Sequence, residues 1–130
     1  MAMRRILLAV FTTIIISMAQ PVHSGTSGYE LKAYCAEAEE DNYFSAGVCM
    51  GYVIGTIDGI TSLIDGVNEV EKSPDGNNPL NMPFCLTENS THGQIVAVVR
   101  KYLEANPDKL HFSGASLITE AMWNTFPCYK

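Results

Sequence analysis

Four cysteines, at positions 35, 49, 85 and 128, restrict the folds that are open to this chain of 130 residues. They follow an N-terminal segment in which Arg4 and Arg5 precede an uncharged, mainly apolar run from Ile6 to Met18, a pattern typical of a secretory signal peptide. The run is shorter than the roughly 20 residues that a membrane span needs, so an uncleaved anchor is the less favoured alternative. An even number of cysteines in an exported chain predicts two disulfide bonds.

We expect residues 1–24 to be a signal peptide that is removed after Ser24, with cleavage after Ala19 as the alternative, and residues 25–130 to form a single domain. That domain keeps all 14 acidic side chains but only six of the eight basic ones, which gives a net charge of about −8. Such acidity argues against nucleic acids and anionic membranes as partners, and it is compatible with a basic protein partner.

Catalysis and metal binding are not expected. The gaps between the cysteines are 14, 36 and 43 residues, and only His92 and His111 remain as imidazole ligands, so the spacing does not suit zinc. Cysteines that pair leave no free thiolate to act as a nucleophile. Asp58 could form an acid–base couple with either histidine, but no serine motif, phosphate-binding loop or metal cluster accompanies it. We therefore expect a protein that is not an enzyme and holds no cofactor.

Apolar residues recur at helical spacing, and no alternating strand pattern is present. Two helices are predicted over Tyr29–Glu40 and Tyr43–Val67, and a third begins at a capping box of Thr91 and Gln94 and stops at Asn106–Pro107. A fourth helix, from Pro107 or His111 to Phe126, aligns Phe112, Ala115, Ile118, Met122 and Phe126. Asn68–Leu86 contains three prolines and is predicted to be a loop. The expected fold is all-α, a small disulfide-stapled bundle of four main helices.

The order of these helices favours one of three disulfide pairings. If the first two helices form an antiparallel hairpin that turns near Asn42, Cys35 and Cys49 lie side by side, each seven residues from the turn. Cys85 and Cys128 would likewise lie at one end of the second hairpin. The alternative, Cys49 with Cys85 and Cys35 with Cys128, would join the two hairpins to each other and remains open at this point.

The second predicted helix carries glycine at every fourth position, 47, 51, 55 and 59. Each glycine costs about 0.8 to 1 kcal/mol relative to alanine in a helix interior, so something is expected to offset the loss. We expect the glycine arc to be buried against a neighbouring backbone. Asp58 falls within this arc and is expected either at its solvated edge or paired with a donor on the element that packs there. The opposite arc is also expected to be buried; it consists of Cys49, Met50, Val53, Ile54, Ile57, Ile60 and Ile64. A membrane span is disfavoured because Asp58 ends the uncharged run after 15 residues.

Three motifs occur in order along the chain. Residues 49–58 read C-x-G-Y-V-x-G-x-x-D and include Gly51, Tyr52, Gly55 and Asp58; residues 94–107 read Q-x-x-x-V-V-x-x-Y-L-x-x-x-P; and residues 110–128 read L-H-x-x-A…A…F-P-C. With the four cysteines, this ordered set resembles the Tai (or Rap) family of type VI secretion amidase immunity proteins over about residues 35–128. One departure is Thr87, which stands where the family usually has proline.

The resemblance implies a periplasmic, helical and often dimeric protein that binds a cognate peptidoglycan amidase and blocks its catalytic cleft. The matching residues belong to the scaffold and do not identify the contact residues. For contact we predict the acidic residues Asp65, Glu69, Glu71 and Asp75, at the end of the second helix and in the loop, because such charges can steer a basic partner. The alternative function is a small periplasmic acid-stress chaperone that exposes apolar surface at low pH.

Overall fold

The described residues fold mainly into helices. A computed structural model describes residues 25–38, 42–71 and 80–128, and within these ranges there is no β-strand. The elements are α2 (Gly28–Glu37), α3 (Tyr43–Val70), α4 (His92–Ala105), a 3-10 turn η1 (Pro107–Lys109) and α5 (Gly114–Thr125). The predicted all-α fold with four main helices is therefore confirmed. The predicted signal peptide lies outside the described residues.

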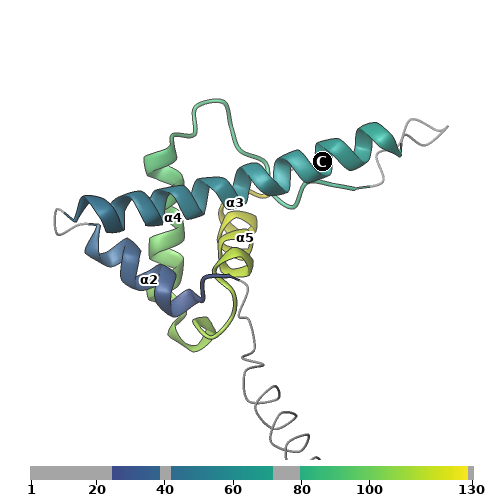
Figure 1. Cartoon of the computed structure of the whole chain (residues 1–130). Coiled ribbons are helices and arrows are strands. Elements are labelled where there is room, and N and C mark those ends of the chain that lie inside the picture. Colours follow the sequence, from purple (N-terminus) through teal and green to yellow (C-terminus); the bar gives the residue numbers. More distant parts are fainter. Residues whose placement is uncertain (1–24, 39–41, 72–79, 129–130) are drawn as a thin grey trace, which may run out of the picture.

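The helices pair as two hairpins. α2 packs along α3, α4 packs along α5, and the second hairpin crosses the N-terminal part of α3 (Figure 1). The C-terminal part of α3 continues past the bundle, where no other described helix accompanies it (Figure 1). A helix rises about 1.5 Å per residue, so the 28 residues of α3 span roughly 42 Å.

Side-chain caps fix the starts of the helices. The predicted capping box of Thr91 and Gln94 is present at α4, and Asn106 ends that helix as expected. A second box, formed by Ser27 and Glu30, begins α2 and was not anticipated from the sequence.

Three helix boundaries differ from the prediction. α2 ends at Glu37, and α3 continues to Val70, so Asn68 and Glu69 are helical rather than part of a loop. The last helix begins only at Gly114, because the 3-10 turn and Ser113, which caps α5, separate it from α4. Phe112 therefore precedes α5 and is exposed, which contradicts its predicted place on the buried face.

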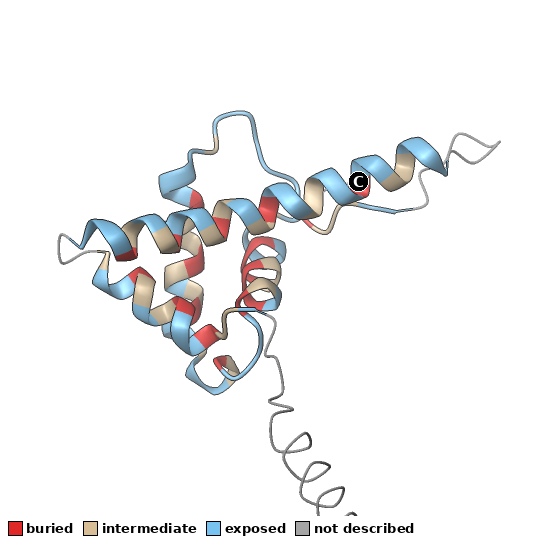
Figure 2. Ribbon diagram, viewed as in Figure 1, coloured by how far each residue is buried: buried red, intermediate tan, exposed pale blue. Residues whose placement is uncertain are grey.

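The core is a single cluster at the centre of the bundle (Figure 2). Burying one large apolar side chain stabilises a fold by roughly 1.5 to 3 kcal/mol, so this cluster is the main source of stability. Phe84 joins it from the segment between α3 and α4 and is 1% exposed. The buried members are Leu31, Cys35, Cys49, Val53, Ile57, Phe84, Ile95, Val99, Leu103, Leu110, Leu117, Ile118, Ala121 and Met122.

Both disulfides follow the favoured pairing. Cys35 bonds to Cys49 within the first hairpin, and Cys85 bonds to Cys128 across the second. Polar contacts support the first bond, because the buried Ser45 hydroxyl donates to the Glu37 carboxylate at 2.7 Å where α2 passes into α3. The alternative pairing between hairpins is excluded.

The segment before α2 is held against the turn before α5 by backbone hydrogen bonds. The N–H of Gly28 donates to the Phe112 carbonyl at 2.9 Å, and the N–H of Gly114 donates to the Thr26 carbonyl at 2.7 Å. Both glycines are tightly packed, since a Cβ on Gly28 would lie 2.4 Å from a Leu117 methyl and 2.8 Å from the Leu110 carbonyl oxygen. The start of the domain is thus fixed to its C-terminal hairpin.

The expectation that both faces of α3 are buried is wrong for the glycine face. A Cβ added at Gly47, Gly51, Gly55 or Gly59 would meet nothing within 4 Å. The opposite face packs into the bundle through Cys49, Val53, Ile57 and Ile64, although Met50 is exposed rather than buried as predicted. The other three helices all lie on that one side, which leaves the glycines facing outward.

Candidate functional site

The C-terminal half of α3, from Asp58 to Val70, exposes large apolar side chains. Leu63 is 64% exposed and Val70 is 85% exposed. Together with Ser62, Gly66, Val67 and Glu71, these two residues line a shallow groove along the projecting part of the helix. We call this surface the α3 groove. Exposed apolar groups beside a groove offer area that a partner could remove from water, so we take this surface as the candidate site.

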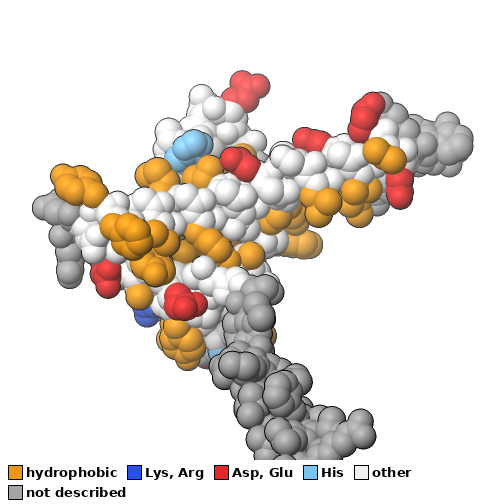
Figure 3. All heavy atoms as spheres, in the orientation of Figure 1, with side chains coloured by type: hydrophobic (Ala, Val, Ile, Leu, Met, Phe, Trp, Pro, Cys, Tyr) orange, Lys and Arg blue, Asp and Glu red, His pale blue; other side chains and the backbone are white. Residues whose placement is uncertain are grey.

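Acidic side chains accompany the α3 groove. Asp65, Glu69 and Glu71 are exposed on the projecting part, and α3 contains no lysine or arginine. In Figure 3 the projecting end shows acidic side chains next to exposed apolar ones. The fourth predicted contact residue, Asp75, lies outside the described residues.

The helix macrodipole does not account for these charges. Glu69 and Glu71 lie at the C-terminal end of α3, where the helix macrodipole is negative, and no basic residue occupies the last turn. A negative charge at this end is unfavourable by about 0.3 to 1 kcal/mol when exposed. The macrodipole therefore does not explain why acidic residues occupy this end of α3.

The segment that follows α3 in the described structure is anchored to the projecting part of that helix. The side-chain amide of Asn68 donates to the Leu80 carbonyl and its oxygen accepts from the Leu80 N–H, both at 3.0 Å. Phe84 then enters the core, and Cys85 connects the segment to Cys128. The acidic end of α3 and the described part of the predicted loop, which Cys85 fastens, are therefore neighbours.

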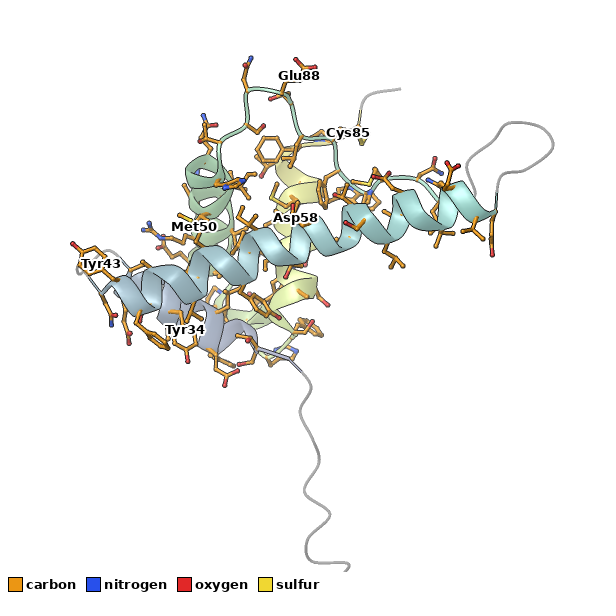
Figure 4. All side chains as sticks on the ribbon, turned by 45° about the horizontal axis from the view of Figure 1, so that its top comes forward. Tyr34, Tyr43, Met50, Asp58, Cys85 and Glu88 are labelled. Carbon is orange, nitrogen blue, oxygen red and sulfur yellow. A yellow bond between two sulfur atoms is a disulfide. The ribbon has the colours of Figure 1, made fainter. Side chains whose placement is uncertain are left out.

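The residues of the C-x-G-Y-V-x-G-x-x-D motif divide between two environments. The half-buried Tyr52 ring points into the bundle, where its edge would lie 3.0 Å from a Cβ on Gly114. Gly51, Gly55 and Asp58 lie on the outward face, and Figure 4 shows Asp58 on the exposed side of α3. The motif thus combines one packing residue with an open face that has no partner within the described chain.

A second polar cluster ties the turn η1 to α5. The Lys109 ammonium donates to Glu120 and, at 3.2 Å, to the Tyr102 hydroxyl. The hydrogen bond from Lys109 lowers the pKa of Glu120, and the one to Glu120 raises the pKa of Lys109. Burial raises the pKa of Tyr102. Because Lys109 and Glu120 neutralise each other in an open position, the cluster acts as a surface tie and offers no poised acid or base.

The histidines give no catalytic arrangement. His111 is exposed and its ring packs against Phe112, with ring centroids 4.1 Å apart, and His92 is exposed at the first turn of α4. Within the described ranges, no group of three or more His, Cys, Asp or Glu side chains is placed to hold a metal ion.

Sequence reasoning missed the apolar part of the α3 groove. Leu63 and Val70 are spaced seven residues apart, which is helical, but they lie outside the predicted buried arc, and Val70 was placed in the loop. The sequence signal that could have indicated this apolar surface is the high hydropathy of α3 as a whole. By length and composition, α3 is the one described helix that could cross a membrane, and only 22% of its 18-residue window with mean hydropathy 1.4 is buried. A core helix of a bundle passes the same test, so the signal is weak on its own.

The fold and these surfaces define a small, disulfide-bonded, helical binding domain. The profile of the Rap1a immunity proteins matches residues 27–128, which covers every described helix. The chain belongs to the Rap1a immunity protein family. No curated protein and no solved structure matches it. Membership implies binding of a cognate effector and fits a protein that inhibits rather than catalyses.

Proposed function

We propose that this chain is a periplasmic immunity protein that binds a peptidoglycan amidase effector of a type VI secretion system and occludes the active cleft of that enzyme. The observation that carries the proposal is the family match over residues 27–128. The N-terminal segment with the pattern of a signal peptide and the two disulfides support export to an oxidising compartment. The family match favours this function over an acid-stress chaperone.

The α3 groove is our candidate for the surface that engages the effector. Its apolar residues supply area that can be removed from water, and Asp65, Glu69 and Glu71 supply charge for a basic rim on the partner. A helix that extends beyond its own bundle can enter a concave site without interference from the rest of the domain (Figure 1).

We further propose that the chain acts as a homodimer in which the open face of α3 packs against a second copy. Glycines at 51, 55 and 59 lie on an exposed helix face, and a Cβ on any of them would meet no described residue within 4 Å, yet each lowers helix propensity. Missing side chains permit close approach of a second helix, and packing across that contact would offset the loss. No lysine or arginine of α3 would be buried there.

The test measures association with the exported amidase encoded beside this chain's gene. The wild-type protein should bind it tightly and abolish its activity at a stoichiometric ratio. The double variant Asp65→Lys/Glu69→Lys should associate more slowly, with a weaker dependence of the association rate on salt, because exposed charges act mainly on that rate. Glu104→Lys/Asp108→Lys, an equal charge change at exposed positions on α4 and η1, is the matched control.

The results separate the parts of the proposal. Equal association rates for both double variants would reject the α3 groove as the contact surface. A wild-type protein that neither binds nor inhibits the amidase would reject the amidase as the target. Recovery of the full-length or processed protein from the cytoplasmic rather than the periplasmic fraction would reject export.

A further inference from the structure

The two disulfides differ sharply in access to solvent. Cys35 and Cys49 are each 1% exposed and belong to the core cluster. Cys85 and Cys128 are both exposed, one in the segment between α3 and α4 and the other after the end of α5. Figure 4 shows Cys85 at the periphery of the bundle, on the segment that leads into α4. A thiol in solution can reach the second bond without any opening of the core.

We propose that the Cys85–Cys128 disulfide is a thiol-exchange site that dithiols reduce in the folded protein while Cys35–Cys49 stays oxidised. A thiolate of the dithiol attacks one sulfur, a mixed disulfide forms, and the other cysteine leaves as a thiolate and takes up a proton. The second thiol then attacks the mixed disulfide and releases the first cysteine. The dithiol loses two electrons and two protons to become a disulfide, and Cys85 and Cys128 gain them as thiols.

The bundle does not depend on this bond for its core. The buried cluster draws its other members from the helices and from the turn at Leu110, and Phe84 is its one member from the segment between α3 and α4. Near the bond, the Cys85 N–H also donates to the Phe126 carbonyl at 2.8 Å. Loss of the covalent link leaves the helices packed. The segment is then held by Phe84 and Met82 against the core, by the Cys85–Phe126 backbone hydrogen bond and by the Asn68–Leu80 pair at its start. Reduction therefore loosens residues 80–91 and the end of the chain locally.

The position of this segment connects its loosening to the proposed binding surface. The same segment is attached through Asn68 and Leu80 to the projecting part of α3, which also carries the α3 groove. Reduction of the disulfide gives the segment more freedom next to this part of α3, and ordering it again on complex formation costs entropy. This consequence, a lower affinity for the effector after reduction, rests on the proposed function; the exchange itself does not.

The test treats the purified, oxidised protein with dithiothreitol in the absence of denaturant, traps thiols with a maleimide over time and maps the labelled peptides. Cys85 and Cys128 should be labelled at least about tenfold faster than Cys35 and Cys49, whose reduction must wait for an opening of the core. The helical circular-dichroism signal should persist at this stage, and limited proteolysis should accelerate between residues 80 and 91.

Two double variants provide the controls. Cys85→Ser/Cys128→Ser should keep the helical signal and show the same rapid proteolysis without dithiothreitol. Cys35→Ser/Cys49→Ser should keep its remaining bond as sensitive to dithiothreitol as in the wild type. If the serine variant at 85 and 128 is too unstable to purify, the labelling time course of the wild type alone decides.

Three labelling results would overturn the proposal: equal rates at both pairs, faster labelling of the core pair, or no labelling without denaturant. Loss of the helical signal together with the first label would also overturn it, because reduction would then unfold the bundle. If selective reduction occurs but amidase binding is unchanged, the exchange site stands and its link to the α3 groove fails. If the oxidised protein does not bind the amidase at all, the proposed function fails and the exchange site is unaffected.

Discussion

Two groups of glycines in this protein lie in opposite surroundings. Gly28 and Gly114 sit where the start of the domain crosses the turn before α5, and a Cβ at either position would meet atoms at 3.0 Å or less. Gly47, Gly51, Gly55 and Gly59 lie on α3 and would meet nothing within 4 Å. The regular glycine repeat of α3 is the more prominent feature of the sequence. The fold, however, requires glycine at the two isolated positions, Gly28 and Gly114.

The comparison separates fold from function. At Gly28 and Gly114 the absent side chain allows backbone hydrogen bonds between segments that are far apart in the sequence. On α3 the absent side chains lower helix propensity and allow no close contact among the described residues, which is why we proposed a second copy as the partner of this face. Substitutions at the two groups should therefore change stability in opposite directions.

The largest effect is expected for Gly28→Ala. The new Cβ would lie 2.8 Å from the Leu110 carbonyl oxygen and 2.9 Å from its Cα, so backbone must move. Overpacking of this kind typically destabilises by about 1 to 3 kcal/mol. Urea unfolding followed by circular dichroism measures the change. A stability equal to that of the wild type would show that the segment before α2 can shift at no cost, and the comparison would lose its first half.

Gly114→Ala should destabilise the fold less. Its Cβ would lie 3.0 Å from the Tyr52 ring and 3.2 Å from a Leu31 methyl, which are side-chain atoms that can shift, and 3.1 Å from the Thr26 carbonyl oxygen. We expect a loss of about 1 kcal/mol, at the low end of overpacking effects. The same unfolding experiment gives the value, and a larger loss than for Gly28→Ala would reverse the order predicted from the contact distances.

Gly51→Ala and Gly55→Ala should stabilise the isolated protomer. Each replaces a helical glycine in open space with the best helix former, which favours the folded state by up to about 1 kcal/mol. The measurement is urea unfolding at protein concentrations low enough to keep the chain dissociated. A loss of stability in both variants would mean that another part of the protein covers this face.

Gly55→Leu tests the face directly and should leave the melting temperature of the protomer nearly unchanged. The leucine side chain would project into solvent in the protomer but would block the close approach of a second helix. Light scattering should then report a monomer, whereas the wild type and the matched control Gly93→Leu, an open glycine on α4, remain dimers. Dimers for Gly55→Leu would move the proposed interface elsewhere, and a monomeric wild type would remove it.

The smallest effect is expected at the surface ion pair of Lys109 and Glu120. Lys109→Met or Glu120→Gln should lower the melting temperature only slightly at pH 7, because an exposed ion pair contributes little. The pKa of Glu120 is lowered in the folded state, so its contribution is present above the unfolded value of about 4.5 and is lost as the pH falls through the folded pKa. The difference in melting temperature between wild type and Glu120→Gln should therefore shrink from pH 7 to pH 3. A large difference at pH 3 would show that packing, and not charge, is affected.

Local sequence signals account for much of the fold. The capping box at Thr91, the stop at Asn106 and the helical periodicity each act over a few residues, and all are present in the structure. The sequence also favoured the disulfide pairing that the structure has, because two adjacent helices joined by a short turn place Cys35 and Cys49 side by side. The structure was needed to exclude the pairing between hairpins. The acidic residues at the end of α3 could also be found from the sequence, because the charge of a side chain follows directly from the residue type.

The surroundings of each helix face required the tertiary structure. Helical periodicity shows that Gly51 and Gly55 share a face, but not whether another helix lies against it; that depends on where α4 and α5, some 40 to 70 residues later, pack. The exposed Phe112 and the closely packed Gly28 have the same origin, since each depends on how the start of the domain meets the segment around Leu110. Burial depends on contacts between distant parts of the chain, and the periodicity of residues within one helix does not show which of those contacts form.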